Sequence, residues 1–591
     1  MENNVYIKKE RGYRMLKELA KCIGEYKKSS LLAPLFITGE VIMEVIIPVI
    51  MAFMIDNGIE KGDMSYVLKI GGLLILTTAI SLMFGMLSGK NAAIASAGFA
   101  KNLRKKMFDT VQSYSFSNID KFSTASIVTR LTTDVTNLQN SYQMIIRIAI
   151  RSPAMLIFSL IMSFLLNAKL ALVFLGIIPV LAGGIFFISR HVHPIFEFVF
   201  KTYDKLNNVV GENLHGIRVV KSFVREDYET KKFKDVSETI YNNFVKAEKM
   251  LAFNSPLMQT CVYTAILLIS WFGAKMIVAD EMTTGQLMSF LTYIMQVLMS
   301  LMMLSMIFVM LTMSKASLKR VVEIIREETD VKNPEEPVSL VKDGSIEFKN
   351  VNFGYNKNKM CLKDINISIK SGETIGIIGG TGSAKSSFVQ LIPRLYDVNS
   401  GEVRVGGKNV KDYDLTTLRD SVAMVLQKNE LFSGTIKDNL RWGNENATDE
   451  DMRHACVLAQ ADEFIKKFPD GYDTKIEQGG TNVSGGQKQR LCIARALMKK
   501  PKILILDDST SAVDTKTDSL IRKAFKEEIP DTTKIIIAQR ISSVQDADKI
   551  IVLDNGAVNG FGTHEELLNT NEIYKEVYYS QVKGGDEDGR A

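Results

Sequence analysis

Apolar residues gather in long runs in the first part of the chain, and these runs are long enough to cross a membrane. A bilayer core about 30 Å thick requires roughly 20 apolar residues in one helix. The pattern before residue 315 therefore predicts six transmembrane helices, approximately at Leu31–Ile55, Val67–Leu87, Ile145–Leu166, Leu170–Ile188, Met258–Val278 and Leu287–Thr312. Runs of this length exclude a wholly soluble enzyme and a disordered chain.

The connections between these segments alternate between short ones and long basic ones. The long connections, Lys90 to Gln143 and Arg190 to Lys249, have few Gly or Pro residues and carry apolar residues at three- and four-residue steps. That period predicts helices that continue beyond the membrane. Because Lys and Arg concentrate there, the positive-inside rule predicts that the long connections and both termini lie in the cytoplasm. We therefore expect a multi-pass protein of the cell membrane, with residues 1–30 as an amphipathic cytoplasmic segment and 31–325 as the membrane domain.

Beyond Arg320 the pattern changes to short apolar runs separated by helical stretches. Residues 326–343 contain Pro and Glu and are expected to form a linker. The alternation that follows predicts an α/β domain with a largely parallel core over residues 344–580. Its expected strands are Ser345–Val351, Thr374–Ile378, Val422–Leu426, Ile503–Leu506, Lys534–Ala538 and Lys549–Leu553. Residues 581–591 are expected to be a disordered tail.

Composition narrows the chemistry only slightly. The 591 residues include 72 Lys and Arg against 66 Asp and Glu, a formal net charge of +6. A charge so small on a chain this long does not favour nucleic acid as a partner, and a cytoplasmic membrane face explains it better. The 5 cysteines show no CxxC spacing, so neither a disulfide framework nor a zinc site is indicated.

The strongest local motif follows the expected strand Thr374–Ile378. A strand, a Gly-rich loop and an apolar helix in this order are typical of a phosphate-binding loop, in which backbone N–H groups surround phosphates. Lys385 supplies a cation for the β- and γ-phosphates, and the Ser386 hydroxyl is placed to bind Mg²⁺. Ala384 replaces the second Gly of this pattern, at a cost of about 1–2 kcal/mol if the position needs a positive φ. The loop residues are Gly379, Gly380, Thr381, Gly382, Ser383, Ala384, Lys385, Ser386 and Ser387.

Two further motifs lie in the second half of the chain. The expected strand Ile503–Leu506 leads into Asp507, which would reach the Mg²⁺ shell, and Asp508, which would polarise the attacking water. Between the phosphate loop and Asp507 lies the motif Ser484, Gly485, Gly486 and Gln487. Together with the phosphate loop, this order resembles the ATP-binding cassette (ABC) transporters. Six spans followed by one cassette are similar to their exporter type over roughly residues 15 to 580.

The resemblance implies ATP and Mg²⁺ as cofactors and assigns further positions. Tyr355 stands where the family stacks an aromatic ring on adenine. Gln427 stands where the family contacts Mg²⁺ and the membrane domain. Asp514, in Ser511–Asp514, stands in the D-loop that crosses to the partner. In the family, the motif corresponding to Ser484–Gln487 closes on the ATP of a second cassette, so this chain, with one cassette, is expected to be a half-transporter that dimerises.

Three positions depart from the family pattern, all in the ATP site that this chain builds itself. Asp508 stands in place of the catalytic Glu, Gln539 in place of the switch His, and Ala384 in place of a loop Gly. This asymmetry resembles the degenerate subunit of bacterial heterodimeric ABC exporters, many of which export drugs. The resemblance implies that ATP is hydrolysed mainly in the site of a different partner chain. It also implies coupling segments near Ser117–Thr132 and Val210–Val220.

Two features of the spans are candidates for the substrate path of amphipathic, drug-like or lipid-like molecules. Glu40 and Glu44 share one face of the first span, where a carboxylate should face a cavity or a partner. A structural hydrogen bond, or water reached at the leaflet edge, explains them equally well. A face of adaptable methionines in the sixth span suits varied apolar ligands, although ordinary helix packing would also explain it. These residues are Met295, Met299, Met302, Met306 and Met310.

Other functions stay open at this point. The sequence is also consistent with a homodimeric exporter that has its own ATPase activity, with a regulatory ATP-binding subunit, or with a dedicated lipid or peptide exporter. Six full spans argue against a pure nucleotide sensor. Glu and Met residues in the spans do not identify a transported molecule.

Overall fold

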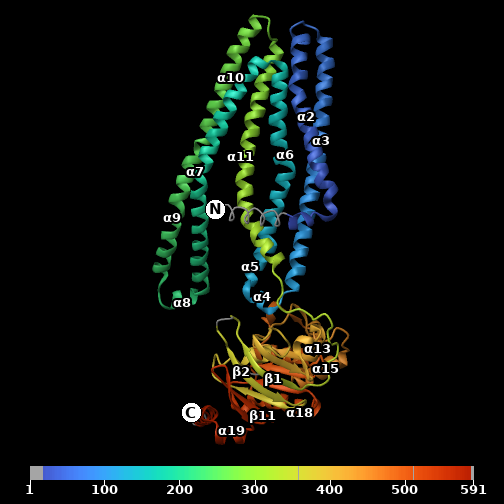
Figure 1. Ribbon diagram of the computed structural model, residues 1–591, viewed down its shortest axis with the longest axis vertical. Coiled ribbons are helices and arrows are strands. Elements are labelled where there is room, and N and C mark those ends of the chain that lie inside the picture. The colour runs from blue at the N-terminus through green and yellow to red at the C-terminus, as the bar shows by residue number, and fades with distance from the viewer. Residues whose placement is uncertain (1–16, 357–358, 510–511, 588–591) are drawn as a thin grey trace. The chain divides into compact units, whose positions relative to one another are not determined.

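The computed structural model describes residues 17–356, 359–509 and 512–587. Contacts between residues divide the chain into two units. The membrane unit comprises Met1–Gln112 and Thr124–Glu327, and the nucleotide unit comprises Ser113–Ser123 and Glu328–Ala591. The ribbon in Figure 1 shows the long helices of the first unit and the sheets of the second.

The membrane unit consists of long helices. Six helices in the part of the chain that the structure describes are long and apolar enough to cross a membrane, which confirms the six predicted spans. Several continue well past those spans, as the long connections predicted, and α3 is the longest example with 49 residues. The helices are α2 (Lys27–Met54), α3 (Met64–Gln112), α5 (Thr124–Thr129), α6 (Val135–Leu166), α7 (Ala168–His215), α8 (Ile217–Ser222), α9 (Glu226–Ala252), α10 (Asn254–Val278) and α11 (Thr284–Arg326).

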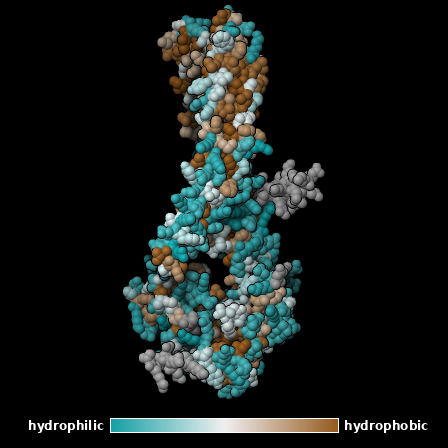
Figure 2. Space-filling model, turned by 90° about the vertical axis from the view of Figure 1, so that its left-hand side faces the viewer, coloured by the Kyte–Doolittle hydropathy of each residue, from teal (hydrophilic) through white to brown (hydrophobic). Residues whose placement is uncertain are grey.

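These helices form two groups in Figure 1: α2 and α3 lie beside α6 and α11, whereas α7, α9 and α10 form an arm. Large buried side chains hold the first group together. The fully buried Tyr293 of α11 donates a hydrogen bond to the carbonyl of Val45 in α2, with an O–O distance of 2.6 Å. Figure 2 shows hydrophobic side chains over one end of the membrane unit and hydrophilic ones toward its other end. That division of the surface is expected where one end contacts lipid and the other water.

The nucleotide unit contains a mostly parallel sheet, as predicted. Among the described residues it has six strands in the order β12-β11-β3-β10-β9-β6, and β12 alone is antiparallel to its neighbour. All residues of β9 and β10 are buried, as expected for parallel strands covered on both faces. The strands are β3 (Thr374–Ile378), β6 (Val422–Val425), β9 (Ile503–Asp507), β10 (Thr533–Ile537), β11 (Lys549–Asp554) and β12 (Ala557–Gly562).

A second, antiparallel sheet has the order β2-β1-β4-β5, of which the sequence indicated only the first strand along the chain. Its strands are β1 (Ile346–Phe353), β2 (Leu362–Ile369), β4 (Ser400–Val405) and β5 (Lys408–Asn409); a short pair is formed by β7 (Gly434–Thr435) and β8 (Lys475–Ile476). The helices of this unit are α4 (Phe116–Lys121), α12 (Lys385–Gln390), α13 (Leu415–Ser421), α14 (Ile436–Arg441), α15 (Asp449–Leu458), α16 (Asp462–Ile465), α17 (Gly485–Leu497), α18 (Thr515–Glu528), α19 (His564–Thr570) and α20 (Glu572–Glu587).

The segment with α4 belongs to the nucleotide unit, although the sequence assigned all of 31–325 to the membrane domain. Tyr396 donates a hydrogen bond to Asp120 at 2.6 Å, and Ser117 donates one to Asp330 at 2.8 Å. Burial alone would raise the pKa of Asp330, but hydrogen bonds from serine hydroxyls outweigh it and hold this pKa below its usual range. Polar side chains therefore fasten α4 to the cassette.

Part of the segment 581–591, which was expected to be a disordered tail, continues a helix. Helix α20 extends through Glu587, so residues 581–587 are helical, while 588–591 lie outside the described residues. The first turns of α20 are held by Tyr574, which is fully buried in the cassette core.

Candidate functional site: the carboxyl edge of the parallel sheet

Four parallel strands deliver the candidate residues to one edge of the sheet. In the register, Ile377 of β3 pairs with Ile537 of β10, and Ile537 pairs with Asp507 of β9. Val425 of β6 pairs with Leu506. Because parallel strands end together, the residues that follow them meet at this edge. They are Gly379 after β3, Gln539 after β10, Asp507 and Asp508 at the end of β9, and Gln427 after β6.

The phosphate loop connects β3 to α12 and presents its cation inward. Lys385 Nζ donates hydrogen bonds to the carbonyls of Gly379 at 2.7 Å and Gly380 at 2.9 Å. A Cβ atom added at Gly380 or Gly382 would have no neighbour within 4 Å, so open space lies next to the loop backbone. A loop with a cation, backbone N–H groups and free space at its glycines fits a polyphosphate.

Ala384 adopts the backbone conformation for which glycine is favoured. Its φ is 70° and its ψ is 26°, in the left-handed region. The sequence predicts a strain of about 1–2 kcal/mol if the backbone at Ala384 has a positive φ. The φ is positive, so we assign that strain to Ala384.

Ser386 and Asp507 form the candidate Mg²⁺ site. The Ser386 hydroxyl donates to Asp507 Oδ1 at 3.1 Å, so two oxygen ligands of the kind that Mg²⁺ prefers are already adjacent. Burial, helped by the neighbouring charge of Asp508, raises the pKa of Asp507. Burial also lowers the pKa of Lys385, against the attraction of the two aspartates. Both shifts disfavour the charged forms, which a bound phosphate and Mg²⁺ would stabilise.

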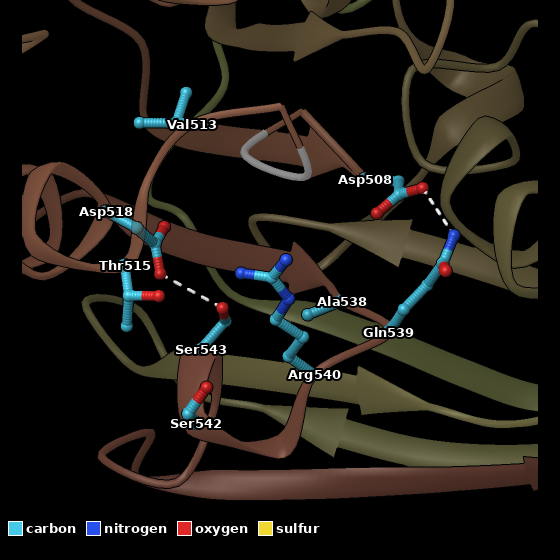
Figure 3. Close-up of a pocket in the computed structure, with 9 residues that line it drawn as sticks. All are labelled: Asp508, Val513, Thr515, Asp518, Ala538, Gln539, Arg540, Ser542 and Ser543. Carbon is cyan, nitrogen blue, oxygen red and sulfur yellow. Dashed lines mark hydrogen bonds between the residues drawn. The ribbon is translucent and has the colours of Figure 1, made fainter. Parts of the chain in front are cut away.

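Asp508 and Gln539, two of the three residues that depart from the family pattern, are hydrogen-bonded to each other. Gln539 Nε2 donates a hydrogen bond to Asp508 Oδ2 at 2.7 Å, as Figure 3 shows. Asp508 has a positive φ, so the chain leaves the path of β9 at this residue. Next to the pair is a cavity of about 130 Å³, lined by Asp508, Val513, Thr515, Asp518, Ala538, Gln539, Arg540, Ser542 and Ser543.

Tyr355 presents an aromatic ring to solvent near the phosphate loop. The residue is 53% exposed, and its hydroxyl contacts Ser387 Oγ at 2.9 Å and donates to Gln390 Oε1 at 3.1 Å. Its ring packs edge-on against Phe353 and Tyr396. A half-exposed aromatic ring that is held beside the phosphate loop is suited to stacking on a nucleobase.

The motif Ser484–Gln487 begins α17. Ser484 caps the helix by accepting from the Gln487 backbone N–H at 3.3 Å, and Gln487 Oε1 accepts from the Ser484 N–H at 3.0 Å. Among the residues that the structure describes, no hydrogen bond joins this motif to the phosphate loop of the same chain.

The same helix contacts the expected D-loop. A Cβ atom on Gly486 would lie 2.9 Å from the carbonyl of Ala512, so only glycine allows this approach. Gln489 accepts from the Ala512 N–H at 3.1 Å, and Asp514 caps α18 by accepting from Thr517 N–H. Ser511 lies outside the described residues.

Comparison with known proteins decides the family. Residues 30–301 match the model of the ABC transporter transmembrane region, and residues 362–511 match the ABC transporter model. The chain is 37% identical over 567 residues to an uncharacterized ABC transporter ATP-binding protein, YfiB, of Bacillus subtilis, covering 95% of this chain and 98% of that one. This chain belongs to the ABC transporter family.

Two other relatives illustrate the range of this family. The ABC transporter ATP-binding protein YknU of Bacillus subtilis, also uncharacterized, is 34% identical, with 94% of each chain covered. An ATP-dependent lipid A-core flippase of Desulfotalea psychrophila is 33% identical, covering 81% of this chain and 84% of that one. The ABC transporter chain therefore combines an exporter-type membrane region with an ATPase domain, and its family pairs each such chain with itself or with another.

In the membrane unit of the ABC transporter chain, Glu40 and Glu44 share a cation that the sequence reasoning missed. Arg151 of α6 binds Glu40 through Nη1 and lies 2.7 Å from Glu44 Oε1 through Nη2. Two carboxylates therefore face one guanidinium, which leaves one negative charge unbalanced. Arg151 lies in the third predicted span, and a cation in an apolar run is the signal that could have pointed to a partner carboxylate.

The methionine face of α11 is exposed on this chain. Met295 is 42% exposed, Met299 48%, Met302 38% and Met306 67%, whereas Tyr293 and Val297 on the opposite face are fully buried. These methionines therefore lie outside the buried core of the unit.

Proposed function

We propose that this chain is one subunit of an ATP-driven exporter, with a weak ATP site of its own and a signature segment that completes the catalytic site of a different partner chain. The single observation that carries this proposal is the Asp508–Gln539 pair beside an otherwise complete set of phosphate- and Mg²⁺-binding residues. We also propose that the cassette and both termini lie in the cytoplasm, because the long connections are rich in Lys and Arg.

The chemistry of the pair explains why the site would bind ATP and hydrolyse it slowly. Asp is one methylene shorter than Glu, which withdraws its carboxylate by about 1.5 Å from the position that activates water. Gln539 donates a hydrogen bond but carries no positive charge. Its 2.7 Å contact also uses an acceptor of Asp508 that a water molecule would otherwise occupy.

The signature segment supports the second half of the proposal. Ser484–Gln487 keep the residue types of the family and a capped helix start, and Gly486 keeps its close approach to Ala512. Such a chain, with a weak ATP site and an intact signature segment, would pair best with a partner whose ATP site has the usual catalytic residues.

We place the substrate path along the Met295, Met299, Met302 and Met306 face and the charged cluster of Glu40, Glu44 and Arg151. Glu44 and Arg151 are each about a quarter exposed, so the cluster is open on one side to an amphipathic molecule with a positive group. One relative is named a lipid A-core flippase, which supports lipid-like molecules as a second class.

Transport measurements test this path. Changing the four methionines to Ala should lower transport of several amphipathic substrates. Met83→Ala on α3, at an exposed methionine off this face, is the control and should leave transport unchanged. Unchanged transport of all these substrates by the fourfold variant would contradict the placement of the substrate path at this methionine face.

The decisive experiment measures ATPase activity of the purified chain alone and of the chain with its candidate partner, each compared with Asp508→Glu plus Gln539→His. We expect the chain alone to be nearly inactive, the pair to be active, and the double change to add modestly. Loss of activity of the pair on changing Ser484 and Gly485 is expected as well. Fast ATP hydrolysis by the unchanged chain alone would contradict the proposal that a different partner chain is needed.

A homodimeric exporter is the second candidate, and one observation favours it. Lys385, Ser386 and Asp507 already have the arrangement that ATP and Mg²⁺ require, and Asp508 still offers a carboxylate at the catalytic position. The same ATPase experiment separates the two candidates, because a homodimer needs no second chain.

A further inference from the structure

The segment that follows β10 is held by a residue far away along the chain. Gln581 of α20 donates a hydrogen bond from Nε2 to the carbonyl of Gln539 at 2.8 Å. Its Oε1 accepts from the backbone N–H of Ile541 at 2.9 Å. We propose that Gln581 is a positioning residue of the ATP site, which fixes the backbone on both sides of Arg540 and so sets where the Gln539 side chain points. Residues 538–543 are called the switch segment below.

The fold places Gln581 with little freedom. Tyr574 precedes it by two helical turns on the same face of α20 and is fully buried. The Tyr574 hydroxyl contacts His564 Nδ1 at 2.7 Å. The backbone N–H of Tyr574 donates to Asn571 Oδ1 at 2.9 Å. Val577 packs against the same core between Tyr574 and Gln581, so the helix is anchored before it reaches Gln581.

The chemistry of a primary amide suits this role. A glutamine side chain has one carbonyl acceptor and an NH₂ donor in one plane, like a peptide group, so it pairs with two backbone groups as a neighbouring strand would. The switch segment is consequently held from two directions. Gln581 holds its backbone, and Asp508 accepts from the Gln539 side chain, which is visible in Figure 3.

The structural role and the catalytic role of Gln581 can be tested separately. The mechanical part, that Gln581 fixes the switch segment, needs only the contacts above. The catalytic part, that this fixation matters for ATP turnover, rests on the proposed function, because it uses the position of residue 539 opposite residue 508.

Hydrogen exchange of the full-length purified chain tests the mechanical part. In Gln581→Ala the Ile541 amide loses its acceptor, and we expect it to exchange at least about tenfold faster. Gln581→Glu keeps an acceptor and loses the donor, so the Ile541 amide should stay protected within about twofold. Ser580→Ala is the matched control, since the Ser580 hydroxyl donates to the Val577 carbonyl of its own helix. Unchanged exchange at Ile541 in Gln581→Ala would overturn the proposal.

Turnover in the Asp508→Glu plus Gln539→His background tests the catalytic part. There we expect Gln581→Ala and Gln581→Glu to lower kcat about five- to tenfold and to change KM for ATP less than twofold, because nucleotide contacts stay intact. A residue with a merely structural role would change kcat and KM together, or neither. Equal kcat in all variants would overturn the catalytic part, while the exchange result would stand.

Two truncations separate Gln581 from the rest of the tail. A chain ending at Glu587 keeps Gln581 and should behave as the full chain does in both measurements. A chain ending at Ser580 loses Gln581 and should reproduce Gln581→Ala. If the chain ending at Ser580 behaved as the full chain does, or if the chain ending at Glu587 behaved as Gln581→Ala does, the role assigned to Gln581 would be rejected.

Discussion

Two charged clusters of this chain, one in each unit, lie in low-dielectric surroundings and differ in how their cation is partnered. At the sheet edge, Lys385 contacts loop carbonyls, and no ion pair of Lys385 occurs among the described residues. In the membrane unit, Arg151 instead binds carboxylates of α2 directly. Because burying an uncompensated charge is costly, a charge left without a partner by the fold is one that a ligand completes. The first cluster is therefore built for a ligand. In the second, Arg151 holds α6 to α2, and only the one carboxylate charge in excess is left for the proposed substrate path.

The largest expected effect comes from removing Arg151. Arg151→Met leaves Glu40 and Glu44 without their cation, and breaking a buried pair in this way costs about 3–5 kcal/mol. Thermal unfolding in detergent should show a markedly lower midpoint. Adding Glu40→Gln and Glu44→Gln to Arg151→Met should recover most of the loss, since no charge then remains unpaired. A variant as stable as the parent would show that the cluster holds nothing together.

Removing the unpaired cation should instead affect ligand binding. Lys385→Met deletes a charge-assisted contact to phosphate worth about 1.5–3 kcal/mol, so ATP affinity should fall roughly 10- to 150-fold with little change in stability. Equilibrium binding of ATP to the purified chain measures this. Lys408→Ala, at an exposed lysine of β5, is the matched control. If Lys385→Met lowered stability and left ATP affinity unchanged, Lys385 would be a structural residue and not a ligand-binding one.

A smaller effect is expected at Ala384. Ala384→Gly removes the strain of a left-handed alanine but restores chain entropy to the unfolded state, so the net gain in the free energy of unfolding should be about 0.5–1 kcal/mol. Thermal unfolding of the full chain is the measurement, and Ala461→Gly, at a position with a φ of −96°, should destabilise it. Equal shifts in both variants would show that Ala384 is not strained.

The smallest effect concerns a third cluster, before the apolar part of α6. Asp134 accepts from Arg320 Nε at 2.7 Å and Ser317 Oγ at 2.8 Å. Burial would raise the pKa of Asp134, but these contacts outweigh it and lower the pKa. Stability from this group is thus present above the unfolded value near 4 and is lost as pH falls through the lower folded value.

Because Arg320 is half-exposed, water screens this pair and the loss should be modest. The unfolding midpoint between pH 6 and 3 measures it, and Asp134→Asn should flatten the profile below pH 4. A parent and variant with parallel profiles would exclude Asp134 as a contributor.

Much of the architecture follows from local pattern. The six spans depend on the length of apolar runs, and the phosphate loop, Ser484–Gln487 and Asp507 are contiguous stretches whose order along the chain is informative. The parallel strands were found because each is a short buried run between turns. The antiparallel sheet was largely missed, although β2 carries the signal of a half-buried strand: Ile365, Ile367 and Ile369 are buried and alternate with exposed residues.

What the sequence determined by itself, then, is the set of elements and the chemistry of each motif. Tertiary structure decided which distant residues meet. Arg151 binds Glu40 111 positions away, Tyr396 fastens α4 to the cassette from 276 positions away, and Gln581 reaches Gln539 over 42 positions. The physical reason is that the rotation of each helix and the register of each strand are set by packing against neighbours, and periodicity along one segment does not specify them.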